Sequence, residues 1–334
     1  MRWRPWRRRS RRCDQFVSDA PGLLTPRVLL PFALVTLIWG STWIVITGQL
    51  GVVPPSWSVA YRFFVGAAAM FAYAAWRRER LSLSGAGWGF AALLGLAQFA
   101  FNFNFVYRAE QHITSGLVAV LFALLIVPNI LLGRLFLKTK VELRFLLGAG
   151  IAIVGVGLMI LHEYRAAAIG AGEVLIGTAL TLCGVMSASV SNVMQGSNVA
   201  RAQSMAVMIA WAMLFGALGD AAFAWITTGP PVIEATPAYI GGVLYLGVIA
   251  SAVTFPLYFN IIRAVGPGQA AWSSVLIPII AMGFSTVLEG YRWAPLSIAG
   301  GAVALVGLVI AVARRPDKPS VSGGTVSVPC EQDG

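Results

Sequence analysis

The chain has 334 residues, of which 58% are hydrophobic and only 11% are charged, and its formal net charge is +11. Soluble domains carry about 25% charged residues, so this composition excludes an ordinary soluble globular protein and favours an integral membrane protein. The positive charge does not indicate nucleic-acid binding, because no folded nucleic-acid module accompanies the basic residues.

Residues 1–27 are the first segment and contain the basic run Arg-Trp-Arg-Pro-Trp-Arg-Arg-Arg. The apolar run that follows is a full span with further spans behind it, which argues against a removable signal peptide. We therefore expect a basic, poorly ordered arm in the cytoplasm. At the other end, residues 314–334 are rich in Pro, Ser and Gly and lack an apolar run, which predicts a disordered cytoplasmic tail.

Between these two segments lie ten apolar stretches of roughly 17 to 25 residues. A helix needs about 20 residues to cross a ~30 Å hydrocarbon layer, and lipid leaves no partner for unpaired backbone amides. The sequence thus predicts an all-α, polytopic membrane protein. The predicted spans are 28–49, 57–76, 88–108, 113–137, 143–161, 172–194, 204–227, 238–261, 268–288 and 295–313.

The basic residues favour one orientation of these spans. With the N-terminus inside, 20 of the 24 Lys and Arg fall in the inner segments, and the outer loops hold only Arg108, Arg165 and Arg292. Such a bias predicts that both termini are cytoplasmic in a multi-pass protein of the cytoplasmic membrane. Anionic lipid headgroups are then the expected partners of the basic inner loops.

An internal repeat emerges when the sequence is shifted by 152 residues. The shift aligns Gly116, Ala119 and Leu124 with Gly268, Ala271 and Leu276. It also aligns Gly148, Ala152 and Gly155 with Gly300, Ala304 and Gly307. The repeats are assigned to 28–161 and 172–313. Because each holds an odd number of spans, the copies must be inverted, an architecture of secondary transporters. The small residues predict close helix packing, so we expect the fifth and tenth spans to be scaffold.

Several motifs carry a resemblance to a known family. They are Trp39-Gly40-Ser41-Thr42, Pro54-Pro55, Arg62-Phe63 and Leu121-Phe122-Ala123-Leu124. With these motifs the chain resembles the drug/metabolite transporter superfamily, specifically its EamA-type members, over nearly the whole region from 28 to 313. The resemblance implies ten helices in two inverted five-helix repeats, which move small organic metabolites by alternating access. It also implies a central cavity formed by the third, fourth, eighth and ninth spans with parts of the first and sixth.

The chain departs from the family pattern in one place. The family's Gly-Glu pair at the ends of the fourth and ninth spans is replaced here by Lys138-Thr139 and Gly290-Tyr291, with Glu289 displaced by two residues. A role for this acidic residue therefore does not carry over from the resemblance. We expect Glu289 and Arg134, near span ends, to face headgroups or water.

Polar and aromatic side chains inside the spans are the candidate solute ligands, since each is costly in lipid unless it faces a cavity or a partner. Gln98 and Asn102 are four residues apart on one helix face, and Asn192 lies in a polar stripe with Ser187, Ser191 and Gln195. Interhelical hydrogen bonding and core packing are the alternative roles. The predicted cavity set is Trp39, Gln98, Asn102, Asn192, Tyr258, Trp272 and Ser274.

Helix breakers and lone charges complete the candidates. Pro128, Pro256 and Pro278 lie inside spans, where a missing amide hydrogen can create a hinge. Asp220 is the one acidic residue well inside a span, and it is a proton-coupling candidate only if it faces the pathway. Arg62 is expected to snorkel outward as a structural anchor.

These features predict a secondary transporter of small organic metabolites, such as amino acids or drug-like solutes, with export as the expected direction. A polar-lined channel or facilitator without a two-state cycle is the alternative. No enzymatic motif is present in the sequence, so we expect no catalytic residue, no organic cofactor and no metal. Driving force, solute identity and oligomeric state stay open.

Overall fold

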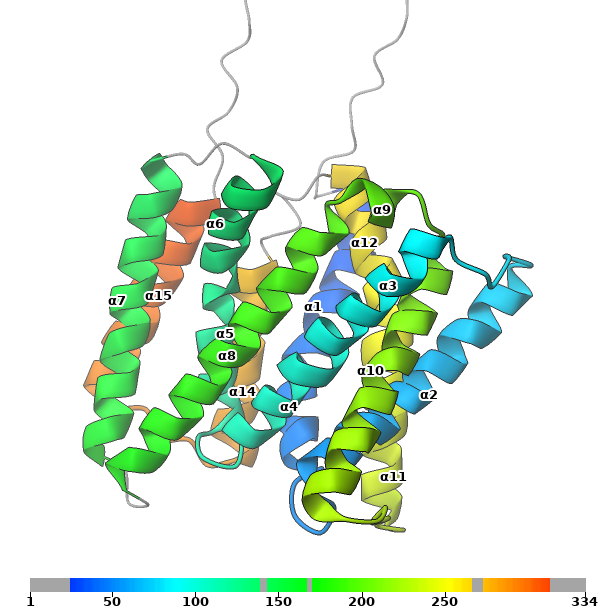
Figure 1. Ribbon diagram of the computed structural model, residues 1–334. Helices are drawn as coiled ribbons and strands as arrows, with labels where there is room; N and C mark the ends of the chain where they lie inside the picture. The colour runs from blue at the N-terminus through cyan, green and yellow to red at the C-terminus, as the bar shows by residue number, and fades with distance from the viewer. Residues whose placement is uncertain (1–24, 139–142, 167–169, 266–272, 313–334) are drawn as a thin grey trace, which may run out of the picture.

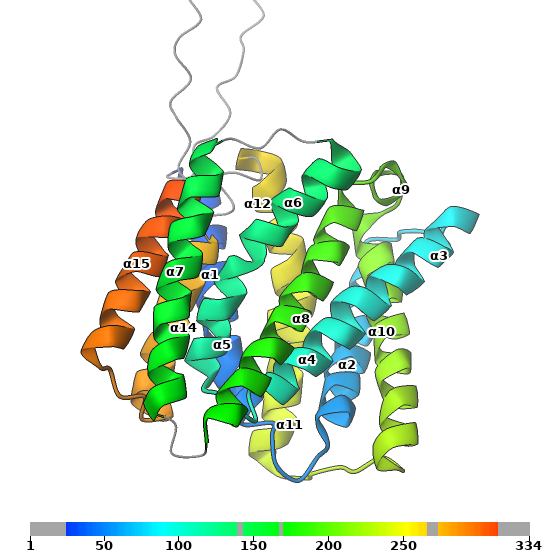
Figure 2. The same cartoon turned by 60° about the vertical axis from the view of Figure 1, so that its left-hand side comes forward.

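The computed structural model describes residues 25–138, 143–166, 170–265 and 273–312. The arm up to residue 24, the tail from residue 313 and Trp272 lie outside this part. All regular secondary structure in the described segments is helical. The helices cross from one end of the molecule to the other as a bundle (Figures 1 and 2). The predicted all-α, polytopic fold class is confirmed.

The first repeat begins with two uninterrupted helices, α1 (Pro26–Thr47) and α2 (Pro55–Trp76). Its third and fourth spans are each broken by a short non-α segment. The third comprises α3 (Gly85–Leu94), the π-helical η1 (Gly95–Phe101) and α4 (Asn102–Ala109). The fourth comprises α5 (Ser115–Phe122), the 3-10 segment η2 (Ala123–Leu125) and α6 (Ile126–Leu137). The fifth is α7 (Leu143–Ala166).

The second repeat follows the same plan. It begins with α8 (Ala171–Gln195), a short α9 (Asn198–Arg201) that the sequence did not predict, and α10 (Met205–Thr228). Its third span consists of α11 (Pro237–Leu244), the π-helical η3 (Tyr245–Val253) and α12 (Thr254–Val265). The last two are α14 (Ser273–Leu288) and α15 (Pro295–Val312).

Local chemistry explains where these helices begin. Pro55 and Pro237 occupy the first turn of their helices, where the missing proline amide costs nothing. The hydroxyls of Ser84 and Ser204 accept hydrogen bonds from the backbone amides of Gly87 and Val207, which satisfies amides that a helix start leaves unpaired. Eight spans are long and apolar enough to cross a membrane, and α14 and α15 are shorter apolar helices.

The two repeats pack against each other with reciprocal contacts. Helix α2 packs on α10, and α7 packs on α15. The π-helical η1 of the first repeat contacts α10, and η3 of the second contacts α2. In the same manner α1 packs against the second repeat's α12 and α14, while α8 packs against α4, α5 and α6. Each helix therefore meets the partner that an inverted two-fold arrangement requires.

Glycines make the tightest of these contacts possible. A Cβ atom at Gly155 would lie 2.2 Å from the backbone nitrogen of Ala304, and one at Gly307 would lie 2.2 Å from that of Ala152. Backbones approach equally closely between η1 and α10, since a Cβ at Gly95 would lie 2.3 Å from the carbonyl oxygen of Ala212. The stripe of small residues in the fifth and tenth spans is thus a packing surface, as the sequence predicted.

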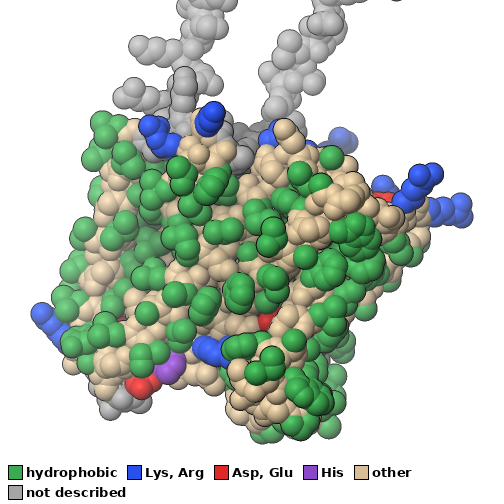
Figure 3. All heavy atoms as spheres, in the orientation of Figure 1, with side chains coloured by type: hydrophobic (Ala, Val, Ile, Leu, Met, Phe, Trp, Pro, Cys, Tyr) green, Lys and Arg blue, Asp and Glu red, His purple; other side chains and the backbone are tan. Residues whose placement is uncertain are grey.

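The outer surface suits a lipid environment. Large apolar side chains such as Leu30, Leu135 and Ile226 are exposed. Hydrophobic side chains cover the middle of the visible face, and Lys and Arg gather mainly at its upper edge (Figure 3). We call this edge, where α1 begins and α15 ends, the terminal end, and the opposite edge, where α1 ends at Thr47, the distal end (Figure 2).

Candidate functional site

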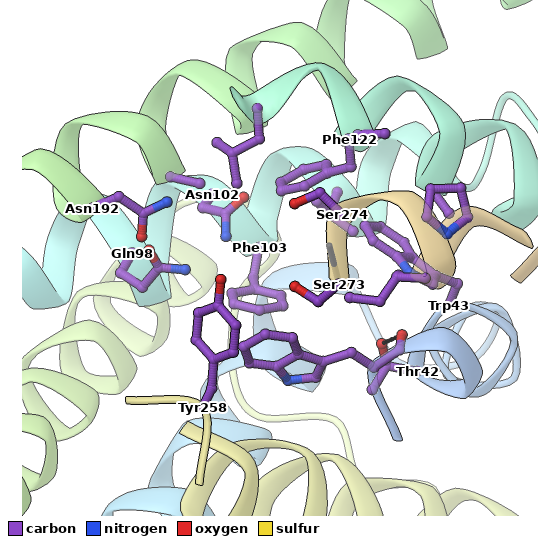
Figure 4. Close-up of a pocket in the computed structure, with 18 of the residues that line it drawn as sticks. Thr42, Trp43, Gln98, Asn102, Phe103, Phe122, Asn192, Tyr258, Ser273 and Ser274 are labelled. Atoms are coloured by element: carbon purple, nitrogen blue, oxygen red, sulfur yellow. Dashed lines mark hydrogen bonds between the residues drawn. The ribbon is translucent and has the colours of Figure 1, made fainter. Parts of the chain in front are cut away.

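A cavity of about 210 Å³ lies in the middle of the bundle, between the two repeats. Its lining comes from α1, α2, the third, fourth, eighth and ninth spans and α8. None of its described lining residues belongs to α7 or α15, so this closely packed pair lies outside the cavity lining. Figure 4 shows the polar and aromatic side chains of this lining pointing toward one another.

Aromatic rings form one wall of the cavity. The Trp39 ring lies 4.9 Å from that of Tyr258 and 5.5 Å from that of Phe255, between centroids. Its Nε1 donates to the carbonyl oxygen of Ala250 over 3.2 Å, which fixes α1 against η3. Trp43 packs in a tilted arrangement on Phe122, with centroids 5.3 Å apart. These rings provide a broad apolar face for part of a solute.

Amide side chains form the opposite wall (Figure 4). Gln98 and Asn102 are both buried, and Gln98 accepts a hydrogen bond from the Ser191 hydroxyl. Asn192 is exposed and donates to Asn129 over 3.4 Å, the long end of the hydrogen-bond range. Two proposed roles therefore coincide at Gln98, which lines the cavity and also ties the third span to α8.

The cavity brings together six of the seven residues that the sequence singled out. Trp272 is the seventh and lies outside the described residues. Whether these side chains bind a solute stays a prediction, because their shared position establishes only that they face one space. The six are Trp39, Gln98, Asn102, Asn192, Tyr258 and Ser274.

The expectation that Arg62 snorkels outward is wrong. Its side chain is only 2% exposed and lines the cavity, because α2 presents this face to the eighth span and not to lipid. The guanidinium lies over the Phe103 ring at 4.2 Å and near the Phe63 ring at 5.1 Å. Its Nη2 donates to the Ser251 hydroxyl over 3.4 Å.

A polar network at the distal end, which we call the distal closure, lies beyond the cavity-lining residues Ile46 and Ala119. The Glu289 carboxylate accepts from the Ser115 hydroxyl at 2.7 Å and from the Ser115 backbone amide at 3.1 Å. Thr47 Oγ1 lies 2.8 Å from Glu110 Oε2 and 3.3 Å from Glu289 Oε1. The network joins α1, α5 and the ends of α4 and α14. Glu289 is half-buried, so these hydrogen bonds add to the expected exposure to headgroups or water and do not exclude it.

The chain matches a known family of membrane proteins in two consecutive segments. The sequence profile of the EamA-like transporter family matches residues 27–161 and again residues 175–313. The chain belongs to the EamA-like transporter family. Members of this family are transporters and not enzymes, which agrees with the absence of enzymatic motifs from the sequence. The double match also accords with the duplication inferred from the 152-residue offset.

Individual proteins that are similar to this EamA-like transporter agree with the family match. The chain is 28% identical over 300 residues to the uncharacterized inner membrane transporter YedA of Escherichia coli, covering 84% of this chain and 92% of that protein. It is 26% identical over 261 residues to protein PagO of Salmonella typhimurium, covering 78% and 84%. A solved crystal structure has the same fold, with a TM-score of 0.62 at 20% identity, covering 84% of this chain and 95% of that one.

Asp220 of this transporter lies away from the cavity. It is 1% exposed and accepts a hydrogen bond from Asn104 Nδ2. Asn104 Oδ1 in turn accepts from Arg108 Nη1 at 2.6 Å, and Arg108 Nη2 donates to the Ser56 hydroxyl at 2.9 Å. The cluster ties α10 to α4 and α2, and Asp220 is not among the cavity-lining residues. A structural role fits this position better than proton coupling.

The three predicted hinge prolines lie next to irregular helix or next to the cavity. Pro128 lies three residues after the end of the 3-10 segment η2, and Pro256 lies three residues after the end of the π-helical η3. A proline clashes with the carbonyl group four residues earlier, which for both residues falls inside the irregular segment. Pro278 lies inside α14 and lines the cavity. Hinge motion at these three sites stays a prediction.

Sequence reasoning missed several functional candidates. Arg62 carried a signal, as the one charge in an otherwise uncharged stretch of α2, but the sequence alone cannot say which face of that helix is buried. Glu110 follows the third span directly and looked like a loop residue. Thr42, Phe103 and Asn129 also line the cavity, and no feature of their spacing separates them from ordinary packing residues.

Proposed function

We propose that this protein is a secondary transporter that carries a small organic metabolite across the cytoplasmic membrane by alternating access. The observation that carries the proposal is the position of the cavity between two inverted repeats, with a polar network of described residues at its distal end. Inverted repeats allow the two halves to exchange roles, so that inward-open and outward-open forms have similar energies around one site.

Side chains at the two ends of the cavity differ in exposure, and this difference indicates from which side of the membrane the cavity is accessible. Ile46, Val106 and Ala119, which lie toward the distal end, are buried, whereas Asn192 near the terminal end is exposed. The distribution of basic residues supports cytoplasmic termini. Together these facts favour a form that is closed to the outside and accessible from the cytoplasm. Export then begins with solute capture in this form.

The size of the cavity bears on the choice of solute. Sites for drug-sized ligands typically measure about 300 to 1,000 Å³, and this cavity measures about 210 Å³. A metabolite-sized solute therefore fits the described form better than a large drug-like one. The aromatic wall and the amide wall suit a solute with an apolar body and a few polar groups.

Transport assays would test the carrier cycle. Metabolites that accumulate in cells lacking the protein, compared with cells that express it, would identify candidate solutes. Uptake of such a solute into proteoliposomes should saturate and should accelerate when the solute is also present on the other side. Asn102→Ala and Asn192→Ala should weaken uptake. Ohmic single-channel currents without saturation would overturn the carrier in favour of the channel alternative.

A further inference from the structure

We propose that Arg62 recognises an anionic group of the solute, so that the cavity takes small organic acids that carry one carboxylate on an apolar or aromatic body. This inference rests on the proposed function, because it names the solute class of the same cavity. It starts from a charged side chain that the interhelical packing leaves largely without partners.

Arg62 is buried yet poorly satisfied. Only its Nη2 has a hydrogen bond, the 3.4 Å contact with Ser251, while its Nε and Nη1 have no hydrogen-bond partner among the described residues. Tyr107 lies beside the guanidinium, but its hydroxyl oxygen is also buried without a hydrogen bond of good geometry. Two buried nitrogens of a cavity-lining side chain are thus left without a hydrogen bond of good geometry, and such groups call for an explanation, which a bound solute would supply.

No carboxylate of the described residues lies within 4 Å of the Arg62 guanidinium. Within the described ranges the one ion pair closer than 4 Å joins His112 and Glu173. The nearest acidic influence on Arg62 comes from Glu110, whose Oε2 is engaged by Thr47. A buried cation without a counter-charge is costly. The Phe103 and Phe63 rings offset part of this cost and hold the guanidinium in place.

The other lining residues indicate the sign of the charge that the solute carries. Arg62 is the only charged residue among the described residues that line the cavity, and none of them is acidic. A cationic solute would meet like charge there, whereas an anion would supply the missing partner. A single guanidinium fork matches one carboxylate with two parallel hydrogen bonds. The Trp39, Phe103 and Tyr258 rings then offer the surface for an apolar body.

Three probes of one shape and different charge would test this inference on the purified full-length protein. They are benzoate, benzamide and benzylamine, with binding measured by titration calorimetry near neutral pH. The wild-type protein should bind benzoate at least about tenfold more tightly than the other two, the size expected for charge-assisted hydrogen bonds. Arg62→Gln should remove this preference, and Arg77→Gln, at an exposed position just after the same helix, should retain it.

A second variant keeps the test decisive if Arg62→Gln does not fold. Asn102→Asp places a carboxylate in the same cavity, where it competes with the solute for Arg62, and should weaken the binding of benzoate more than that of benzamide. Equal binding of benzoate by the wild type and Arg62→Gln, or a wild-type preference for benzylamine, would overturn the inference. These binding measurements need no transport. Benzoate binding without any solute exchange in proteoliposomes would refute the carrier while leaving the anion site standing.

Discussion

The two ends of the cavity differ in how they are held together. At the distal end, Thr47, Glu110, Ser115 and Glu289 join four spans through short hydrogen bonds. Toward the terminal end, the contact between Asn129 and Asn192 is a single bond of 3.4 Å between partly exposed side chains. Among the described residues, the hydrogen bonds that join spans at the distal end are therefore shorter and more numerous than the single Asn129–Asn192 bond.

This contrast has a consequence for the transport cycle. A carrier must break the closure at one end before it opens there, and the free energy of that closure sets how rarely the opposite form is populated. Charge-assisted hydrogen bonds contribute about 1.5–3 kcal/mol each. Loss of the two bonds from Ser115 to Glu289 would therefore change the balance between the two forms substantially.

The largest expected effect is on the stability of the protein and concerns the close contact between α7 and α15, which we treat as a rigid frame. Gly155→Leu should destabilise the protein by about 3 kcal/mol, because its side chain would collide with the backbone of α15. Gly157→Leu is the matched control, since a Cβ at Gly157 meets nothing within 4 Å. Thermal unfolding in detergent would measure both. Equal melting temperatures of the two variants would show that the α7–α15 contact is not a rigid frame.

The second largest effect should come from breaking the distal closure, which should change the accessibility of the cavity. Glu289→Ala removes both bonds from Ser115 and should raise the accessibility of the cavity from the distal side by about tenfold or more. A cysteine at Ala119, in a chain without Cys13, Cys183 and Cys330, would report this through labelling with an impermeant maleimide. Glu173→Ala removes a carboxylate outside the closure and should leave the labelling rate unchanged. The same rate in both variants would contradict the role given to Glu289.

The pH dependence of the distal closure should be smaller. Burial raises the pKa of the Glu110 carboxyl well above its usual range; nearby Glu289 also raises it, while the Thr47 hydrogen bond and Arg62 lower it. A carboxyl with a raised pKa in the closed form binds its proton more tightly there than in a hydrated open form. Closure is therefore favoured at low pH, and this stabilisation is lost as the pH rises through the raised pKa.

Labelling of the Ala119 cysteine would measure this effect. Its rate should increase as the pH is raised above the usual pKa of a glutamate carboxyl, in an otherwise unmutated chain and beyond the change in intrinsic thiol reactivity. Glu110→Gln mimics the protonated carboxyl and should stay closed throughout. A rate that rises equally in both proteins would mean that Glu110 does not control the closure.

The smallest effect should be found at the terminal end. Asn129→Ala removes only a long and exposed hydrogen bond, which contributes at most about 0.5 kcal/mol. The balance between the two forms should hardly move, as distal labelling would detect. A change as large as that of Glu289→Ala would erase the contrast between the two ends.

The sequence predicted the spans well because bilayer thickness fixes their length. The predicted span 57–76 corresponds to α2 at Pro55–Trp76, and 172–194 corresponds to α8 at Ala171–Gln195. The repeat was equally visible, since close backbone contacts demand small residues at matching positions, as at Gly155 and Gly307. Polar residues in spans pointed to the cavity for a similar physical reason, the cost of placing them in lipid.

The contacts between helices could not be predicted from the sequence. The burial of Arg62 depends on which face α2 turns to the eighth span, and the partnership of Glu289 with Ser115 joins residues 174 positions apart. The π-helical η1 contains no proline. The close contact of its Gly95 with α10 is a tertiary feature that no local pattern encodes.

Distances across both ends of the cavity would test alternating access most directly. Spin labels at exposed Gln111 and Arg292 would report on the distal end, and labels at exposed Arg134 and Arg201 on the terminal end. When a transported solute is added to the protein in lipid nanodiscs, the distal distance should increase as the terminal distance decreases. Two distances that stay fixed, or that change in the same direction, would contradict a carrier whose two ends open in turn.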